Sequence, residues 1–284
     1  MAKKKRINWR YDKDKDWIDK MADAKNKKEK NLARRIEERF EKGLELLKSP
    51  KLWKNVGIVL LLLLWVGVVL FATQFCLKHL FRWIFPDNLD SVMVQALYTF
   101  VVDGIALALI ILLPWKILKK KTTLKEMGVE GNLTWTDIGL APIGFFAYII
   151  MAMIGQWLLP AVDWQAEQDI GYNLSNLIGT DLLMVFFAVV IIAPIAEELI
   201  FRGWLYGKIK QIVPTWLAVI LVSVLFGIMH GQVNVGINVF FLSIALCMLR
   251  EMTGTIYSGV LLHMLKNGIA LAFLLWSENP YIFN

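Results

Sequence analysis

Three short segments in the carboxyl-terminal half of the chain carry the side chains that could do chemistry. The first holds the adjacent carboxylates Glu197 and Glu198, followed by Arg202. Glu198 and Arg202 are four residues apart, so on a helix they share one face and can pair, whereas Glu197 is rotated by about 100° and points elsewhere. This spacing predicts that Arg202 keeps Glu198 ionised while Glu197 faces a cavity, where a nearby histidine would tune it as a general base.

The second and third segments add imidazole and amide groups. His230 follows a long uncharged run, and His263 precedes Asn267 by four residues, so that the last two face the same way on a helix. Both can donate hydrogen bonds, and two donors that converge on one point suit an oxyanion. A single membrane histidine more often hydrogen-bonds a neighbouring helix, and a lone Glu–Arg pair is more often structural. Together the six residues favour a reactive site, with a structural network as the alternative.

Long apolar segments must position these residues. The chain is 57% hydrophobic, whereas soluble domains contain about 45–50% apolar residues. The pattern predicts an all-α, polytopic membrane bundle with about seven transmembrane helices, or eight if the region near the sixth segment includes a re-entrant piece. The sixth segment is short, and residues 231–236 are expected to form a tight connection. The expected spans are 56–77, 92–118, 137–159, 181–201, 215–233, 235–249 and 255–276.

Charge sets the expected orientation and the division of the chain. Residues 1–55 contain 19 Lys and Arg against 10 Asp and Glu, so this basic tail is expected in the cytoplasm. Basic residues in 116–125, at 208–210 and at Arg250 place alternate connections on the same side, and the acidic segment 160–180 lies opposite. The sequence thus predicts a multi-pass protein of the cell membrane, with a tail (1–55), a transmembrane domain (56–276) and a short end (277–284).

The basic tail also suggests a partner. Apolar residues recur in it at helical spacing among arginines and lysines, which favours an amphipathic helix on anionic lipid. A solvated tail that only enforces topology is the alternative, and nucleic acid is not expected as a partner beside a membrane domain. The apolar positions are Leu32, Ile36, Phe40, Leu44 and Leu47.

The order and spacing of the three segments resemble a known family. The pattern EExxxR, FxxxH and HxxxN reads here Glu197-Glu198 with Arg202, Phe226 with His230, and His263 with Asn267. It is similar to the CAAX prenyl protease and bacteriocin-processing family of intramembrane endopeptidases, over about residues 181–276. The resemblance implies hydrolysis of a peptide bond in a membrane cavity.

The resemblance also implies roles for the six residues. Glu197 would be the general base, with His230 as its partner in activating a water. His263 and Asn267 would stabilise the oxyanion, while Glu198 and Arg202 would position the base. The family is often described as metalloproteases, and one Glu with two His suits Zn²⁺. Its prenyl-protease branch resembles a glutamate-type hydrolase without metal, and the chain has no HExxH helix, so metal dependence stays open.

These observations predict a protease that acts on a peptide or a membrane-proximal protein segment, in bacteriocin self-immunity or peptide-signal processing. The alternatives are a non-catalytic membrane partner of a sensor or receptor, and a small transporter with a proton relay through Asp103, Glu197 and His230. One inconsistency concerns the expected spans, which put Glu197 and His230 near opposite faces of the membrane. Either the fourth helix continues past Arg202 or the fifth begins later than expected.

Overall fold

A computed structural model describes Arg34 and residues 48–118, 121–164, 166, 172, 174, 177 and 179–278. The amphipathic helix expected in the tail lies outside these residues, apart from Arg34. The chain divides into two compact units, Met1–Gly57 and Ile58–Asn284. The second unit contains the site.

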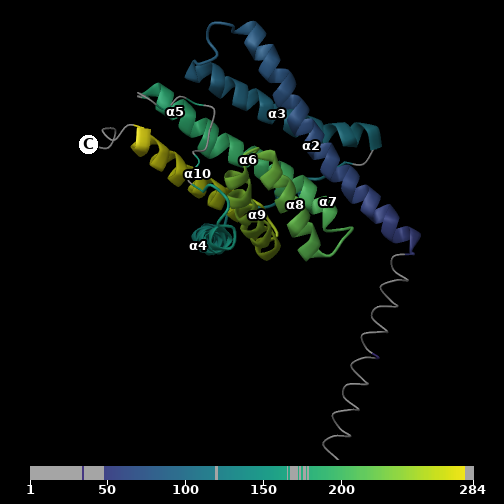
Figure 1. Cartoon of the computed structure of the whole chain (residues 1–284). Helices are drawn as coiled ribbons and strands as arrows, with labels where there is room; N and C mark the ends of the chain where they lie inside the picture. The colour runs from purple at the N-terminus through teal and green to yellow at the C-terminus, as the bar shows by residue number, and fades with distance from the viewer. Residues whose placement is uncertain are drawn as a thin grey trace, which may run out of the picture. The chain divides into compact units, whose positions relative to one another are not determined.

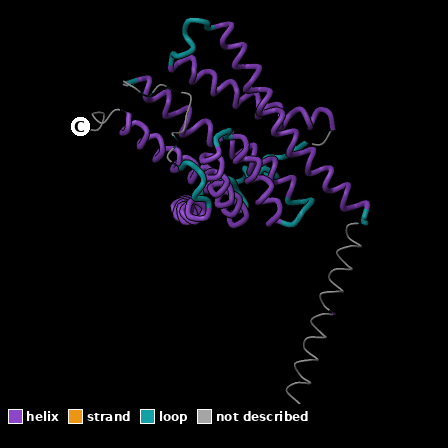
Figure 2. Tube along the Cα trace, viewed as in Figure 1, coloured by secondary structure: helices purple, strands orange, loops and turns teal. Residues whose placement is uncertain are grey.

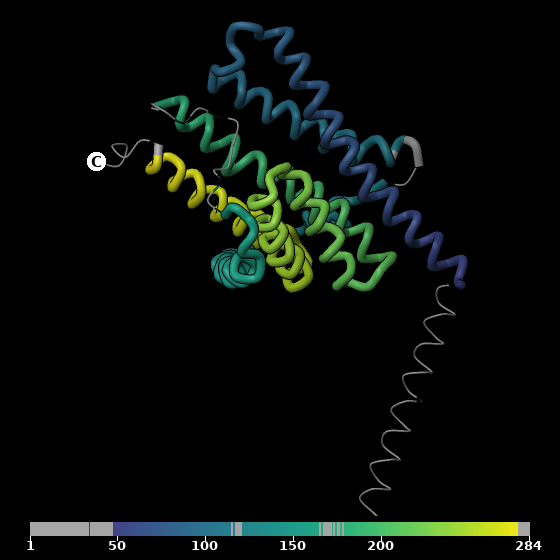
Figure 3. The backbone as a smooth tube through the Cα atoms, viewed as in Figure 1, coloured from purple at the N-terminus to yellow at the C-terminus, as the bar shows by residue number. Residues whose placement is uncertain are grey.

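The regular structure of the described residues is entirely helical (Figure 2). In the part of the chain that the structure describes, six helices are long and apolar enough to cross a membrane, which confirms a polytopic helix bundle. Thr180–Ile209 forms one of these six, which Figure 3 shows as one uninterrupted tube. Its consecutive pieces are α5 (Thr180–Phe186), η1 (Phe187–Ile192), α6 (Ala193–Glu198), η2 (Leu199–Leu205) and α7 (Tyr206–Ile209). The other helices are α2 (Pro50–Ile84), α3 (Val92–Leu118), α4 (Trp135–Leu158), α8 (Thr215–Met229), α9 (Val233–Thr253) and α10 (Tyr257–Glu278).

The outward faces of the bundle are apolar. Large side chains such as Leu61, Phe71 and Phe146 are about two-thirds exposed, and similar residues recur along α2, α3 and α4. A soluble protein rarely exposes so much contiguous apolar surface. Lipid is the solvent that such a surface fits, so the chain is a multi-pass membrane protein.

The helix boundaries correct two of the expected spans. The fifth segment is the short one, since α8 ends at Met229, and the sixth is full-length, since α9 runs from Val233 to Thr253. The chain turns at Gly231, whose φ of 72° lies in the left-handed region that glycine adopts without strain. Gly236, expected in the connection, instead belongs to α9.

α8 and α9 pack against each other through glycines. A Cβ on Gly227 would lie 2.6 Å from the carbonyl oxygen of Gly236, so the backbones touch and leave no room for a side chain. Small residues allow membrane helices to approach this closely. α9 and α10 also pack against α4, and α10 packs against η1 and α6, which brings α8, α9 and α10 around the long helix (Figure 1).

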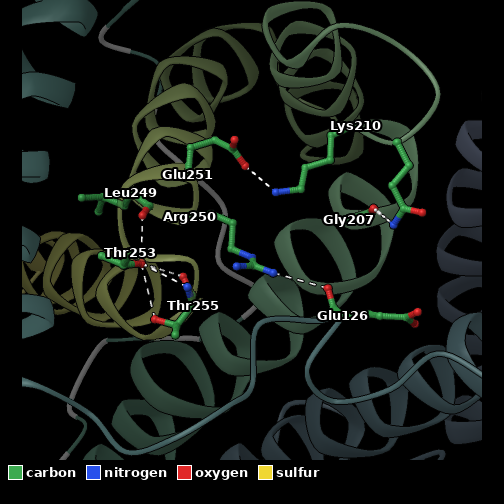
Figure 4. Close-up of polar contacts among 9 residues, drawn as sticks. Glu126, Gly207, Lys210, Leu249, Arg250, Glu251, Thr253 and Thr255 are labelled. Atoms are coloured by element: carbon green, nitrogen blue, oxygen red, sulfur yellow. Dashed lines mark hydrogen bonds and ion pairs between the residues drawn. The ribbon is translucent and has the colours of Figure 1, made fainter.

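A polar network joins the carboxyl-terminal ends of α7 (Tyr206–Ile209) and α9 to the 121–131 segment (Figure 4). The Lys210 Nζ lies 2.6 Å from Glu251 Oε1, and the side chain of Arg250 donates to the carbonyl oxygen of Glu126 at 3.3 Å. Cations near a helix end can satisfy free carbonyls and complement the helix dipole. The network therefore fastens a connecting segment to the bundle at this end.

Candidate active site

The long helix Thr180–Ile209 changes its winding around the paired carboxylates. The α-helical segment α6 (Ala193–Glu198) contains both, and the π-helical segments η1 (Phe187–Ile192) and η2 (Leu199–Leu205) flank it. Short π segments often occur at functional sites. The helix also extends eight residues beyond the expected end at residue 201, to Ile209. This extension resolves the inconsistency between the expected positions of Glu197 and His230.

The first π segment leaves a carbonyl oxygen without a donor, and Asn267 fills that position. Ala193 N–H donates to Ala188, five residues back, which skips Val189. Continuing the same pattern, residue 194 would donate to Val189, but Pro194 has no N–H. The side-chain amide of Asn267 donates to Val189 O at 3.0 Å instead. Asn267 thus fixes α10 against the widened turn.

A fully buried ion pair lies immediately after this turn. An Arg202 guanidinium nitrogen donates to Glu198 Oε1 at 2.8 Å, and both side chains are 0% exposed. The pairing follows the expected four-residue spacing. The guanidinium also lies over the ring of Phe226, 4.4 Å from its centroid, an arrangement that stabilises a cation. The position of Glu198 is therefore fixed by Arg202.

The imidazole of His263 lies between the two carboxylates. Its Nδ1 is 3.0 Å from Glu198 Oε1 and donates to it, because a carboxylate oxygen can only accept. Its Nε2 faces Glu197 Oε2 at 3.7 Å, beyond direct hydrogen-bond distance. Glu197 points away from Arg202, as the helical spacing predicts, yet both carboxylates meet opposite edges of one ring.

Glu197 differs from Glu198 in exposure. Its side chain is 31% exposed, whereas that of Glu198 is 0% exposed. Its Oε2 is nevertheless buried and has no hydrogen-bond partner among the described residues. The 3.7 Å between this oxygen and Nε2 of His263 leaves no room for a water molecule between them, so water reaches Glu197 at the exposed part of its side chain. The geometry thus offers an accessible carboxylate beside a positioned imidazole.

His230 caps the end of α8 on another side of the same cluster. Its Nδ1 donates to the carbonyl oxygen of Phe226 at 2.8 Å, which in the neutral ring leaves the lone pair on Nε2. Its ring packs edge-on against Phe226, with centroids 4.9 Å apart, and Phe226 also packs against His263. His230 was expected as the partner of Glu197. The ring within ion-pair distance of Glu197 is instead that of His263, whereas His230 interacts with Glu197 electrostatically.

The expected oxyanion donors each make one bond to another group of the protein in this structure. His263 Nδ1 is used by Glu198 and one N–H of Asn267 by Val189. The second amide hydrogen of Asn267 and Nε2 of His263 are the groups that remain available. Five of the six expected residues belong to α6, η2 and α10, and His230 directly follows α8, which packs against η2.

The spacing of motifs did not reveal two further ionisable residues near the cluster. Asp103 of α3 interacts electrostatically with Glu197, and its Oδ2 is buried without a described partner. Lys266 of α10 interacts electrostatically with Glu197 and His230. Their charge inside apolar spans was the available signal, because such residues are rare in lipid.

A zinc centre needs three protein ligands that converge on one point. Within the described part of the chain, no group of three His, Cys, Asp or Glu side chains is placed to hold a metal ion. Nδ1 of His263 bonds to Glu198 and Nδ1 of His230 bonds to a backbone carbonyl, which is also how histidine ligands of metals are oriented, and Nε2 is the ring nitrogen that each leaves for a ligand.

Fold and site together define a multi-pass helical membrane protein with a buried Glu–Arg–His cluster and an adjacent accessible carboxylate. Residues 179–269, about a third of the chain, match the family model described as Rce1-like, type II CAAX prenyl endopeptidase. The resemblance to the CAAX protease family is thereby confirmed for this segment, and it supports a CAAX-type intramembrane protease in general terms. No curated protein and no solved structure matches the chain.

Proposed function

We propose that the protein is an intramembrane endopeptidase in which Glu197 activates a water molecule for attack on a peptide bond. The observation that carries the proposal is the placement of His263, held at Nδ1 by the buried Glu198–Arg202 pair and directed by Nε2 at Glu197. A partly exposed carboxylate next to a positioned imidazole is the arrangement that general-base hydrolysis requires.

In the proposed reaction, Glu197 takes a proton from a water molecule at the exposed part of its side chain, and the resulting hydroxide attacks the carbonyl carbon of the substrate. His263, whose positive charge Glu198 would balance, donates from Nε2 to the developing oxyanion, and the second N–H of Asn267 is the nearest additional donor on α10. Protonated Glu197 then gives its proton to the leaving amine as the C–N bond breaks. The products are one carboxylic acid and one amine, and the carboxylate of Glu197 is regenerated.

His230 has a supporting part in this proposal. Its Nδ1–H is committed to Phe226, so its Nε2 can accept a hydrogen bond from the attacking water. Two acceptors, Glu197 and His230, would then orient the two hydrogens of that water and direct an oxygen lone pair toward the substrate. Their electrostatic interaction supports this placement.

We also propose a class of substrate and a physiological context, from the position of the site between transmembrane helices. A peptide or the membrane-proximal segment of a protein can reach a site between transmembrane helices, and bacteriocin self-immunity or peptide-signal processing are the contexts we propose. The excess of Lys and Arg in residues 1–55 supports a cytoplasmic amino terminus in the cell membrane. The same basic tail would bind anionic lipid.

Cleavage of peptides by the purified protein tests the function. The full-length protein in detergent is incubated with a peptide library, and new termini are identified by mass spectrometry. Glu197→Gln should reduce cleavage by about 100- to 10,000-fold, because an amide cannot accept the proton. The thermal unfolding temperature should change little, because the Glu197 carboxylate makes no described hydrogen bond at its buried oxygen.

Two controls complete this experiment. Glu126→Gln removes a carboxylate at the far end of the bundle, near Lys208, and should leave cleavage unchanged. Preincubation with a chelator should not abolish cleavage if protein groups alone activate the water. Full activity of Glu197→Gln would refute the proposed mechanism, and the absence of any cleavage by the wild type would favour a non-catalytic membrane partner.

A further inference from the structure

A polar cavity of about 260 Å³ lies between α4, α9 and α10. Its wall includes the side chains of Tyr148, Gln156, Asn234, Asn238 and Lys266. Four amide or ammonium groups around one small cavity are unusual in a helix bundle whose outer surface is apolar. Polar groups inside a membrane domain are costly, so their concentration here indicates a polar ligand.

Lys266 connects this cavity to the candidate active site. It directly precedes Asn267 in α10, and its ammonium interacts electrostatically with Glu197 and His230. None of the ion pairs within 4.0 Å among the described residues includes Lys266. The cavity therefore presents a cation that is available to an anion and lies next to the groups proposed for catalysis.

The amide of Asn238 is a further donor in the wall of the cavity. The hydroxyl of Tyr148 donates to Asn238 Oδ1, which leaves the NH₂ group of Asn238 for a ligand. Asn234 donates from Nδ2 to the carbonyl oxygen of Ala166 at 2.7 Å, and Ala166 also lines the cavity. An ammonium with an amide NH₂ beside it matches an oxyanion with two acceptor oxygens better than it matches a cation or an apolar group.

We propose that the Lys266 cavity binds a carboxylate of the peptide substrate and thereby sets which peptide bond reaches Glu197. This proposal rests on the proposed function, and it deepens it by naming a charged group that the substrate carries. The carboxylate is either the carboxyl-terminal end of the peptide or the side chain of an Asp or Glu. Lys266 thus determines specificity by contacting a part of the substrate that is separate from the scissile peptide bond.

Binding to a variant that does not cleave isolates this inference from catalysis. The Glu197→Gln protein in detergent is titrated with three pools of fluorescently labelled nonapeptides, followed by anisotropy. One pool lacks Asp and Glu and ends in a free carboxylate, the second is the same pool amidated at its end, and the third is amidated with one internal Glu. A charge-assisted contact is expected to tighten binding by about tenfold or more over the amidated pool.

Substitutions then assign that preference to Lys266. Adding Lys266→Met should make all three pools bind alike, whereas Lys266→Arg should retain the preference. Lys210→Met, a cation paired with Glu251 at the other end of the bundle, is the matched control and should change nothing. Preference for the first pool alone identifies the chain end, and equal preference for the third pool identifies an acidic side chain. Either result supports the proposal.

Equal binding of the three pools by the Glu197→Gln protein would overturn the inference, and so would a preference that survives Lys266→Met. If Lys266→Met does not fold, the comparison of pools on Glu197→Gln and on Lys266→Arg still decides it. The proposed function fails separately, when the wild type cleaves none of the pools although one of them binds with preference.

Discussion

Two ion pairs of this protein, each between a glutamate and a basic side chain, lie in different surroundings. The pair Glu198–Arg202 is 0% exposed, packs against Phe226 and holds His263. The pair Lys210–Glu251 (Figure 4) is 30% and 35% exposed and fastens the ends of α7 and α9. Water can replace either partner of the second pair but not of the first, so we expect the buried pair to control function and the exposed pair to be dispensable.

Removal of Arg202 should give the largest loss of stability. Arg202→Met leaves Glu198 buried without its cation, and breaking a buried pair in this way costs about 3–5 kcal/mol. Thermal or denaturant unfolding in detergent measures the loss. If Arg202→Met unfolds no more easily than Lys210→Met, the burial of the pair does not determine its energetic importance.

Removal of both buried charges should separate stability from function. In the double variant Glu198→Leu/Arg202→Met no uncompensated charge remains, and replacing a buried pair by apolar residues is often neutral or stabilising, by about 1–4 kcal/mol. The unfolding temperature should therefore return toward the wild-type value. Peptide cleavage should stay absent, because Nδ1 of His263 loses its acceptor. Recovery of both properties would show that the pair is only structural.

The link between Asn267 and Val189 should have an intermediate effect. Asn267→Leu leaves the carbonyl oxygen of Val189 unpaired, because Pro194 offers no N–H, and an unsatisfied buried acceptor costs about 1–3 kcal/mol. Unfolding of this variant is compared with that of Asn234→Leu, which loses a side-chain bond at the exposed rim of the bundle. Equal effects would mean that the widened turn does not depend on Asn267.

The exposed pair should give the smallest effect. Lys210→Ala removes an ion pair that is about one-third exposed, and such pairs contribute about 0–1 kcal/mol. Stability and cleavage should both stay near wild type. A large loss of cleavage in Lys210→Ala would show that the two ends of the long helix are coupled, and the comparison would have to be revised.

Relations within one helix were predictable from the residues. The spacing of Glu198 and Arg202 predicts their bond, and the third, second and seventh hydrophobic segments lie within two residues of α4, α3 and α10 at both ends. The ends of α8 and of the long helix were placed wrongly, although Lys208 and Lys210 follow the fourth apolar segment and Gly231 interrupts the fifth. Hydrophobicity there does not distinguish a helix that ends at Gly231 from one that continues.

Relations between helices were less predictable. The spacing of His263 and Asn267 on α10 predicts that they share a face. It does not predict that His263 lies between both carboxylates while Asn267 bonds to a backbone carbonyl. That outcome depends on the two π segments, which shift the register of the long helix by fractions of a turn. No spacing in the sequence predicts this shift of register, although Pro194 is one of its causes.

The sequence by itself determined that this protein lies in a membrane, that its helices are apolar, and that most of its few intramembrane charges belong to three segments. Those properties depend on composition and on 100° of rotation per residue, which are local. Only the tertiary structure decided that His263 meets Glu197 and that Lys266 lines a polar cavity beside it. Contacts between helices depend on where backbones approach, as at Gly227 and Gly236, and that approach is a property of the whole packed bundle.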